Sequence, residues 1–547
     1  MTTDLEKRPA LPSWKRVATA TFFAIAGTIG TQASNDSRLP DETLRIDTHS
    51  QGTPFPHYWE TVFGSGRAIL SLRDSYRADL RSVKQSTDLQ SVRFHGIFMD
   101  DVGLYDPDRK PIQFAQMKNA ATATENTGIY NFSYIDQIYD GLLENGVRPF
   151  IELSFMPKKM ASDPNALHAF WYKQNVSPPK DYVVWDAMIT AFAQHLIERY
   201  GIEEVSRWDF EVWNEPNIDF WVGKPAQASY FELYDHTALA LKRVNTQLRV
   251  GGPSTAQAAW TGDFLRHCKE NNIPVDFASS HVYANDTAKD VFHTDEVIPR
   301  DRMVCRSVRK VHDEILASPL PSTPLIFSEY NASYANEPNV TDTIYMGPWL
   351  ATTISQCDGL TESMSYWTFS DVFEEQGVVR TPFYGGFGLF AENHIPKPAF
   401  NAFAMFHQLG DRRLPLSSDS ALATRRPDGT LVIALWNYVP PDGTGASYTS
   451  PPASRGPSKT FTLQMTGVPP NAYAIIHRLD EDHGNVIKAY DAMGRPPFPS
   501  RKQIADLRSA GKPAPSERVT LKNANLTIQV PPQGLVLITI GNRKAAR

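Results

Sequence analysis

The sequence predicts a (β/α)₈ barrel followed by an antiparallel β-sandwich. Between residues 60 and 410, eight short apolar runs alternate with stretches whose apolar residues recur at helical spacing. No Gly-rich turn, the mark of a doubly wound nucleotide-binding sheet, follows the first runs. Beyond about residue 410 the chain changes to short β-branched runs with turn residues between them. We therefore expect a barrel over residues 34–410 and a sandwich over residues 411–547.

Residues 1–33 have the pattern of a secretory signal peptide. Lys15 and Arg16 precede the apolar run 17–30, and the small residues of TQAS follow it. This order of basic, apolar and small residues is typical of an export signal, and the run is too short to span a bilayer comfortably. We expect cleavage near Ala33, a secreted or periplasmic protein and no stable membrane span. The alternative is a buried N-terminal helix.

The eight apolar runs are near-continuous, as expected of strands buried on both faces. They cover residues 60–66, 91–98, 148–155, 208–216, 249–255, 277–283, 324–331 and 362–369. Intervening stretches such as 75–88 and 182–201 have helical periodicity. Eight such strands separated by helices predict a closed, all-parallel sheet.

Six later runs predict the sandwich, and one stretch within them predicts a helix. The runs are 429–438, 459–465, 473–480, 518–523, 525–530 and 534–540, and their partial alternation suits sheets with one buried face. Residues 500–511 (SRKQIADLRSAG) form a short helical insert. The segment that precedes the barrel is a candidate to pair with this sandwich.

Charge and cysteine content exclude several function classes. The net charge is −6, which leaves no electrostatic footprint for nucleic acid. Cys268, Cys305 and Cys357 show no metal-ligand spacing, although export would permit one disulfide among them. We expect no metal and no cofactor.

Polar residues gather where the predicted barrel strands end, which is where barrel enzymes have their active sites. These residues are Arg93, His95, Asn214, Glu215, His281, Tyr283, Glu329, Tyr366 and Trp367. Glu215 and Glu329 end different strands but face one pocket. Two such carboxyl groups, one protonated and one ionised, are what glycoside cleavage needs, and a separation of about 5–5.5 Å is typical of retaining enzymes.

Seven motifs, in this order along the chain, resemble segments of glycoside hydrolase family 39. They are GSGR (64–67), RFHGIFMDD (93–101), EVWNEPN (211–217), SHVY (280–283), FSEYNASY (327–334), YWTFSDVFEEQG (366–377) and FYGGFGLF (383–390). The likeness covers roughly residues 55–540. It implies a retaining enzyme in which Glu215 is the acid/base and Glu329 the nucleophile. Tyr384 departs from the pattern, because many xylosidase-like members carry His there.

The resemblance also implies roles in binding an oligosaccharide substrate. Asn214 would contact the sugar 2-hydroxyl and His95 another hydroxyl, while Trp367 would stack under the ring. His281 and Tyr283 would orient Glu329, and Glu374 or Glu375 would reach a further hydroxyl. Arg67 and Arg93 are either counter-ions of the carboxylates or sugar ligands.

The function expected from the residues and the resemblance is that of a secreted retaining exo-glycosidase. It is most like a β-xylosidase acting on xylo-oligosaccharides. Within the family, α-L-iduronidase and arabinose- or galactose-releasing activities are the alternatives; a uronic acid would call for a basic residue, for which Arg380 is a candidate. A non-catalytic carbohydrate-binding protein would be expected to lack one of the two carboxylates, and both are present.

Overall fold

The computed structural model describes residues 41–108, 129–441, 456–469 and 472–541. The predicted signal peptide at 1–33 lies outside these ranges. Among the helices within them, none combines the length and the apolar character needed to cross a bilayer.

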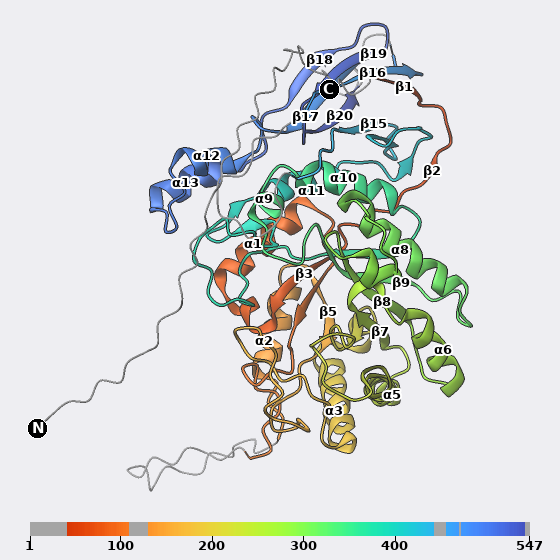
Figure 1. Ribbon diagram of the computed structural model, residues 1–547, viewed down its shortest axis with the longest axis vertical. Coiled ribbons are helices and arrows are strands. Elements are labelled where there is room, and N and C mark those ends of the chain that lie inside the picture. The colour runs from red at the N-terminus through yellow and green to blue at the C-terminus, as the bar shows by residue number, and fades with distance from the viewer. Residues whose placement is uncertain (1–40, 109–128, 442–455, 470–471, 542–547) are drawn as a thin grey trace, which may run out of the picture. The chain divides into compact units, whose positions relative to one another are not determined.

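Eight parallel strands close into a barrel in the order β10-β3-β4-β5-β6-β7-β8-β9, which confirms the predicted fold (Figure 1). Each strand overlaps one of the eight apolar runs that were predicted to be strands. The strands are β3 (Val62–Arg67), β4 (Ser91–His95), β5 (Arg148–Leu153), β6 (Asp209–Val212), β7 (Arg249–Thr255), β8 (Phe277–Tyr283), β9 (Leu325–Asn331) and β10 (Ser363–Tyr366). Strands β8 and β9 are buried at every position, as expected of parallel strands covered on both faces.

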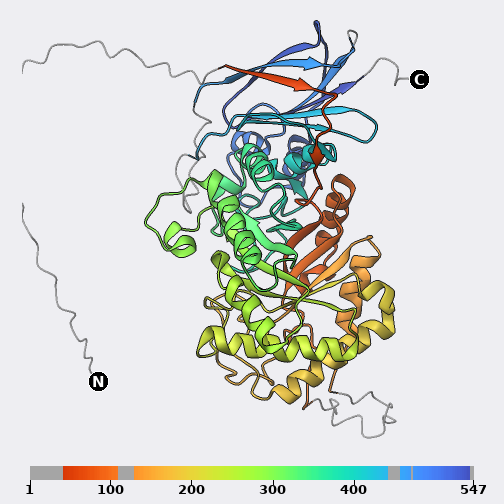
Figure 2. The ribbon, with the colours of Figure 1, turned by 90° about the vertical axis from the view of Figure 1, so that its right-hand side faces the viewer.

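Amphipathic helices surround the barrel (Figure 2). In α8, residues such as Val304, Val308 and Ile315 recur at helical spacing and are buried. The longer helices are α1 (Asp74–Ser86), α2 (Ser133–Leu143), α3 (Tyr182–Tyr200), α5 (Ala226–Val244), α6 (Thr261–Asn271), α8 (Arg300–Leu316), α10 (Met346–Gln356) and α11 (Pro398–Phe406). Short helices are η1 (Ala68–Leu72), α4 (Ile202–Val205), η2 (Ala256–Ala258), α7 (Ala288–Phe292) and α9 (Pro338–Thr341), and β11 (Phe390–Ala391) pairs with β12 (Ile395–Pro396).

The C-terminal region contains two sheets that share a second apolar core, including Ile433, Leu463 and Ile538. The larger sheet contains β2 (Thr53–Pro54), β13 (Arg412–Arg413), β14 (Ala421–Arg425), β15 (Leu431–Trp436), β17 (Tyr473–Leu479), β18 (Glu517–Thr520) and β20 (Leu535–Gly541). The smaller one contains β1 (Glu42–Asp47), β16 (Lys459–Thr466) and β19 (Asn525–Val530). Their pairings are antiparallel except for β1 with β16, which run parallel.

The helical insert has two helices where the sequence predicted one. Helix α13 (Arg501–Ala510) begins with a capping box formed by Ser500 and Gln503. Helix α12 (Val486–Ala492), which precedes it, was not predicted because seven residues are too few to show a helical period. Its side chains Val486 and Ile487 pack in a small core with Ile395.

Sandwich and barrel share apolar contacts through α10 and α11. Leu479 of β17 and Leu535 of β20 belong to the same buried cluster as Trp349 of α10 and Phe403 of α11. At Gly347 of α10, a Cβ atom would lie 3.1 Å from the side chain of Leu479 and 3.3 Å from that of Leu535. Glycine therefore allows this helix to approach the sheet closely.

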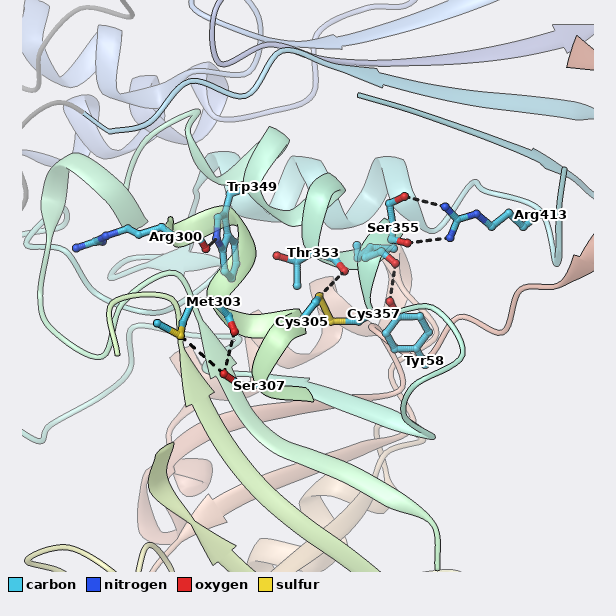
Figure 3. The surroundings of a disulfide bond; sticks show 11 residues. Tyr58, Arg300, Met303, Cys305, Ser307, Trp349, Thr353, Ser355, Cys357 and Arg413 are labelled. Carbon is cyan, nitrogen blue, oxygen red and sulfur yellow. Dashed lines mark hydrogen bonds between the residues drawn. A yellow bond between two sulfur atoms is a disulfide. The ribbon is translucent and has the colours of Figure 1, made fainter. Parts of the chain in front are cut away.

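A disulfide joins Cys305 of α8 to Cys357, the residue that ends α10 (Figure 3). Cys268 is buried and unpaired. The bond ties together the helices that follow β8 and β9.

Candidate active site

A cavity of about 600 Å³ opens where the barrel strands end. Carboxylate side chains and aromatic side chains dominate its wall. The carboxylates are Glu215, Asp219, Asp286, Glu329 and Glu375, and the aromatic residues are Phe170, Trp171, Phe220, Tyr283, Tyr334, Trp367 and Phe387. Such a mixture of apolar faces and hydrogen-bonding groups suits a sugar, whose ring has both.

Glu215 reaches this cavity through a tight turn after β6. Its backbone is left-handed (φ 44°), and its N–H donates to the carbonyl of Ser254 at 2.8 Å. Left-handed backbone in a residue other than glycine is strained and persists when surrounding contacts hold it. The turn places the Glu215 side chain at the cavity wall, where 11% of it is exposed.

Glu329, on β9, is held by two donors. Nη1 of Arg93 donates to its Oε1 at 2.7 Å, and the hydroxyl of Tyr283 donates to its Oε2 at 2.6 Å. Donors to a carboxylate stabilise its ionised form. Glu329 is thus fixed in orientation with a charge partner beside it.

The two carboxyl groups are neighbours, with one oxygen of Glu215 and one of Glu329 within 4.8 Å of each other. Between them lies His281, whose Nδ1 is 3.1 Å from Oε1 of Glu215 and 3.7 Å from Oε1 of Glu329. Only the first of these distances is a hydrogen bond.

The environments of the two carboxyl groups differ. Burial and the facing charge of Glu329 raise the pKa of Glu215 well above its ordinary value. Burial also raises the pKa of Glu329, but Arg93, His95 and Tyr283 act in the opposite direction. When one of the two carboxyl groups is protonated, we expect it to be Glu215, because no Lys or Arg among the described residues is hydrogen-bonded to its carboxyl group.

Arg93 is the centre of a buried ionic network beneath the cavity. Besides Glu329, it donates to Glu211 at 2.6 Å and to the Asn214 side-chain oxygen at 2.9 Å, and it lies 2.9 Å from Glu152. The Arg93 side chain is fully buried. Of the two roles considered for it, the structure shows that of a counter-ion.

The remaining predicted residues divide into those that face the cavity and those that do not. Tyr283, Trp367 and Glu375 line it. Glu374 instead accepts hydrogen bonds from Arg67 at 2.6 Å and Arg73 at 2.5 Å, so Glu375 is the member of the pair that faces the site. Burial, and then the charge of Glu329, raise the pKa of Glu375 well above its ordinary value.

Three predicted binding residues are nearly or fully buried and do not line the cavity. His95 is hydrogen-bonded to Glu152 at 2.7 Å, and its Nε2 lies 3.9 Å from both Glu329 and Glu375. Asn214 is held by Arg93. His281 was expected to bind substrate and to orient Glu329, and both roles stay predictions; its Nδ1 lies 3.7 Å from Oε1 of Glu329, beyond hydrogen-bonding distance. It is fully buried, and its ring is turned so that Nδ1 bonds Glu215 while Nε2 lies 3.0 Å from Ser328.

Sequence reasoning missed the interior carboxylates and most of the cavity wall. Glu152 and Glu211 lie within buried strands, and a charged residue inside such a run is the signal that was overlooked. Asp286, whose pKa burial raises to about 7, comes from a loop after β8. The wall residues Phe170, Trp171, Phe220, Tyr334 and Phe387 also come from loops, where no periodicity marks them.

Two clusters in the site have donor sets that could hold a metal ion: His95, Glu152 and Glu329, and Glu215, His281 and Glu329. The guanidinium of Arg93 already contacts Glu152 and Glu329. A cation bound by the first cluster would lie beside the positive charge of Arg93. The second cluster also contains Glu329, which Arg93 contacts. These donors fit an ion-pair network better than a metal site.

Glycosidases act with two carboxyl groups that flank one sugar, and this structure has two such buried groups at the mouth of a parallel barrel. The chain is a glycoside hydrolase. The family model described as "Glycosyl hydrolases family 39" matches residues 42–526. The chain belongs to this family.

Characterised relatives agree with this assignment. A beta-xylosidase of Geobacillus stearothermophilus is 39% identical over 472 residues, covering 83% of this chain and 86% of the relative. A beta-xylosidase of Caldicellulosiruptor saccharolyticus is 32% identical over 503 residues, covering 89% and 95%. The crystal structure of a monomeric beta-xylosidase from Caulobacter crescentus CB15 aligns with a TM-score of 0.80 at 31% identity, covering 92% of this chain and 100% of that one.

Proposed function

We propose that this chain is an exported, retaining exo-β-xylosidase. The observation that carries the mechanism is the pair Glu215 and Glu329, which have oxygens within 4.8 Å of each other and different partners. This spacing suits direct attack by one carboxylate. An inverting site, by contrast, separates its carboxyl groups by about 6.5–9.5 Å to admit water.

In the first step Glu329 attacks the anomeric carbon while Glu215 gives its proton to the leaving oxygen. The glycosidic bond breaks, an ester forms between the sugar and Glu329, and the alcohol departs neutral. Arg93 and Tyr283 keep Glu329 ionised and aimed beforehand. This prior placement removes the need for rearrangement during the reaction.

In the second step the ionised Glu215 takes a proton from water, and the oxygen of that water attacks the anomeric carbon. The ester bond to Glu329 breaks, and the sugar leaves with its original anomeric configuration. Glu215 is protonated again, so the site returns to its initial state.

The cavity wall supports an uncharged sugar. Among the described residues, no Lys or Arg lines this cavity, whereas five carboxylates line it. A uronic acid would meet like charges there. Arg380, the candidate for binding such a substrate, does not line this cavity but an adjoining one of about 290 Å³, which shares Glu375, Gln376 and Phe387 with it and also contains Tyr384. The beta-xylosidase relatives favour xylose as the sugar that is released.

The disulfide between Cys305 and Cys357 supports export, because such bonds persist in oxidising compartments. N-terminal sequencing of the protein from the culture medium or periplasm of its host tests this part. We expect a start near residue 34. Recovery of intact Met1 from the cytosol would contradict export.

A panel of aryl glycosides tests the activity: β-xyloside, α-L-arabinoside, β-galactoside and α-L-iduronide. We expect the highest kcat/KM on the β-xyloside. Proton NMR of the first product formed should show β-xylose, and a 2-fluoro-xyloside should leave a sugar on the peptide containing Glu329. Initial formation of α-xylose would identify an inverting enzyme.

A further inference from the structure

A chain of hydrogen bonds runs through the barrel interior to Glu215. Nε of Arg93 donates to Oε2 of Glu211 at 2.6 Å, and the Ser328 hydroxyl donates to Oε1 of the same carboxylate at 2.5 Å. Nε2 of His281 lies 3.0 Å from the Ser328 oxygen, and Nδ1 of His281 lies 3.1 Å from Oε1 of Glu215. Apart from Glu215, these residues are fully buried.

The donors in this chain can be assigned in sequence from Arg93. A guanidinium only donates, so Oε2 of Glu211 accepts from Arg93, and Oε1 accepts from the Ser328 hydroxyl. The single hydroxyl proton of Ser328 is used on Glu211, so the Ser328 oxygen must accept from Nε2 of His281. A neutral imidazole has one N–H, which leaves Nδ1 as an acceptor.

An acceptor at Nδ1 bonds Glu215 only when Glu215 carries a proton. We propose that Glu211, Ser328 and His281 form a positioning relay that fixes the Nε2–H tautomer of His281 and thereby holds the catalytic proton on Glu215. This inference rests on the proposed function, since it concerns the acid of that reaction. It assigns no chemical step to the three relay residues, none of which lines the cavity.

The relay acts in both halves of the reaction. When Glu215 has given up its proton, its carboxylate faces the lone pair of Nδ1 without a hydrogen bond between them. This contact disfavours the ionised form, so Glu215 is a stronger base toward water in the second step. Protonation by that water restores the bond to His281.

Other charged groups face these two side chains but do not select the tautomer. Glu215 is faced by Glu329, Asp286, Arg93 and Glu375. His281 is faced by Arg93, by His95 and by Glu329, whose Oε1 lies 3.7 Å from Nδ1. Burial and the Arg93 charge lower the pKa of His281 well below its ordinary value, in agreement with a neutral ring. The second neighbour of Nε2 is the Ser254 hydroxyl at 3.4 Å, which itself accepts from Arg93 at 3.3 Å.

Two variants break the relay in different ways. Ser328→Ala removes the acceptor of Nε2–H. Glu211→Gln reverses the chain: its amide oxygen must face Arg93, so its NH₂ faces Ser328, whose hydroxyl then donates to Nε2. The matched control is Ser279→Ala on β8, because the Ser279 hydroxyl is buried and has no hydrogen-bond partner among the described residues.

We expect both relay variants to lose about tenfold in kcat/KM on a phenyl β-xyloside, a fraction of the roughly 10²–10⁴-fold that general acid catalysis contributes. On a dinitrophenyl β-xyloside, which needs no proton, the loss should stay within about threefold. The alkaline limb of the pH profile should move to lower pH by about one unit, which is the same tenfold change. Ser279→Ala should match wild type in all three measurements.

NMR of the ring nitrogens, with ¹⁵N-labelled histidine, tests the tautomer without activity. The His281 signals are assigned by their loss in His281→Gln. We expect a protonated Nε2 and an unprotonated Nδ1 in wild type, and the reverse in Glu211→Gln. An Nδ1–H tautomer or a cationic ring in wild type overturns the relay, even if Ser328→Ala does not fold.

The two proposals can fail separately. If Glu215→Ala loses activity equally on both xylosides, Glu215 is not the acid, and the proposed function fails whatever the tautomer. If Glu215→Ala shows the leaving-group dependence but both relay variants match Ser279→Ala, the relay is wrong and the proposed mechanism stands.

Discussion

Gly64 of β3 lies against the indole ring of Trp367, so closely that a Cβ at this position would be 2.4 Å from Cε3 of the ring. Trp367 lines the cavity beside Tyr283 and Phe387. The first glycine of the GSGR motif is thus explained by a side chain about 300 positions later in the chain. Gly64 therefore sets how far the indole of Trp367 extends into the cavity.

Gly64→Ala should therefore push Trp367 toward the cavity. We expect kcat/KM on an aryl β-xyloside to fall by roughly 10–100-fold, because small displacements of positioning groups cost up to about two orders of magnitude. The measurement is steady-state kinetics together with near-ultraviolet circular dichroism of the tryptophans. Gly262→Ala is the control, since its added Cβ would meet nothing closer than Glu314 at 4.0 Å. Equal kinetics for the two variants would show that Trp367 adapts.

Removal of the acid should depend on the leaving group. Glu215→Ala should lose on the order of 10²–10⁴-fold on a phenyl xyloside and much less on a dinitrophenyl xyloside in the first step. The glycosyl-enzyme should then accumulate, and azide should release it as β-xylosyl azide because azide needs no base. Glu329→Ala should be inactive on both substrates. Absence of azide rescue together with an equal loss on both xylosides would remove Glu215 from the role of acid/base.

The pH profile follows from the raised pKa of Glu215. A raised pKa keeps the acid protonated to higher pH, so kcat/KM on a phenyl xyloside should fall as pH rises through that value. On a dinitrophenyl xyloside the alkaline limb should be absent or weaker, because the first step then needs no proton. A limb of the same position and depth on both substrates would assign it to another group.

Lys397 is a buried cation on which two buried carboxylates depend. It lies 2.6 Å from Asp342 and 3.2 Å from Asp371, and none of the three side chains is more than 1% exposed. Lys397→Met should lower the free energy of unfolding by about 3–5 kcal/mol, since it leaves buried charge unpaired. Urea denaturation followed by fluorescence measures this. Lys488→Met, which removes an exposed ion pair with Asp482, should leave the midpoint of urea denaturation unchanged. An equally unchanged midpoint in Lys397→Met would contradict the stabilising role of the buried ion network.

The disulfide should contribute to stability and not to chemistry. The double variant Cys305→Ala/Cys357→Ala should lower the free energy of unfolding by about 2–4 kcal/mol, the usual effect of closing a loop of this kind. Its kcat and KM should equal those of wild type, because neither cysteine lines the cavity. Mass spectrometry after alkylation of the unfolded, unreduced protein should find one modified cysteine, Cys268. Three modified cysteines would show that the bond does not form.

How much could be predicted from the sequence depended on the type of signal. The barrel strands lie in near-continuous apolar runs, so all eight were recognisable, and the two carboxyl groups were found because strand ends in a barrel converge. The ring orientation of His281 was not predictable, because it depends on Ser328 of the next strand. Glu152 and Glu211 were missed because they lie within apolar runs, where a charge is not expected. Their buried charges are stabilised by the opposite charge of Arg93.

The parallel pairing of β1 with β16 has a consequence for biosynthesis. Arg45 and Gln464, which face each other in this pair, are 419 residues apart in the chain. As the polypeptide is made, its first strand has no partner until most of the protein has been translated. An early strand without its partner postpones completion of the smaller sheet until the last part of the chain has been made. A nascent chain cut short before residue 459 would present this strand edge to other molecules, so truncated products should aggregate.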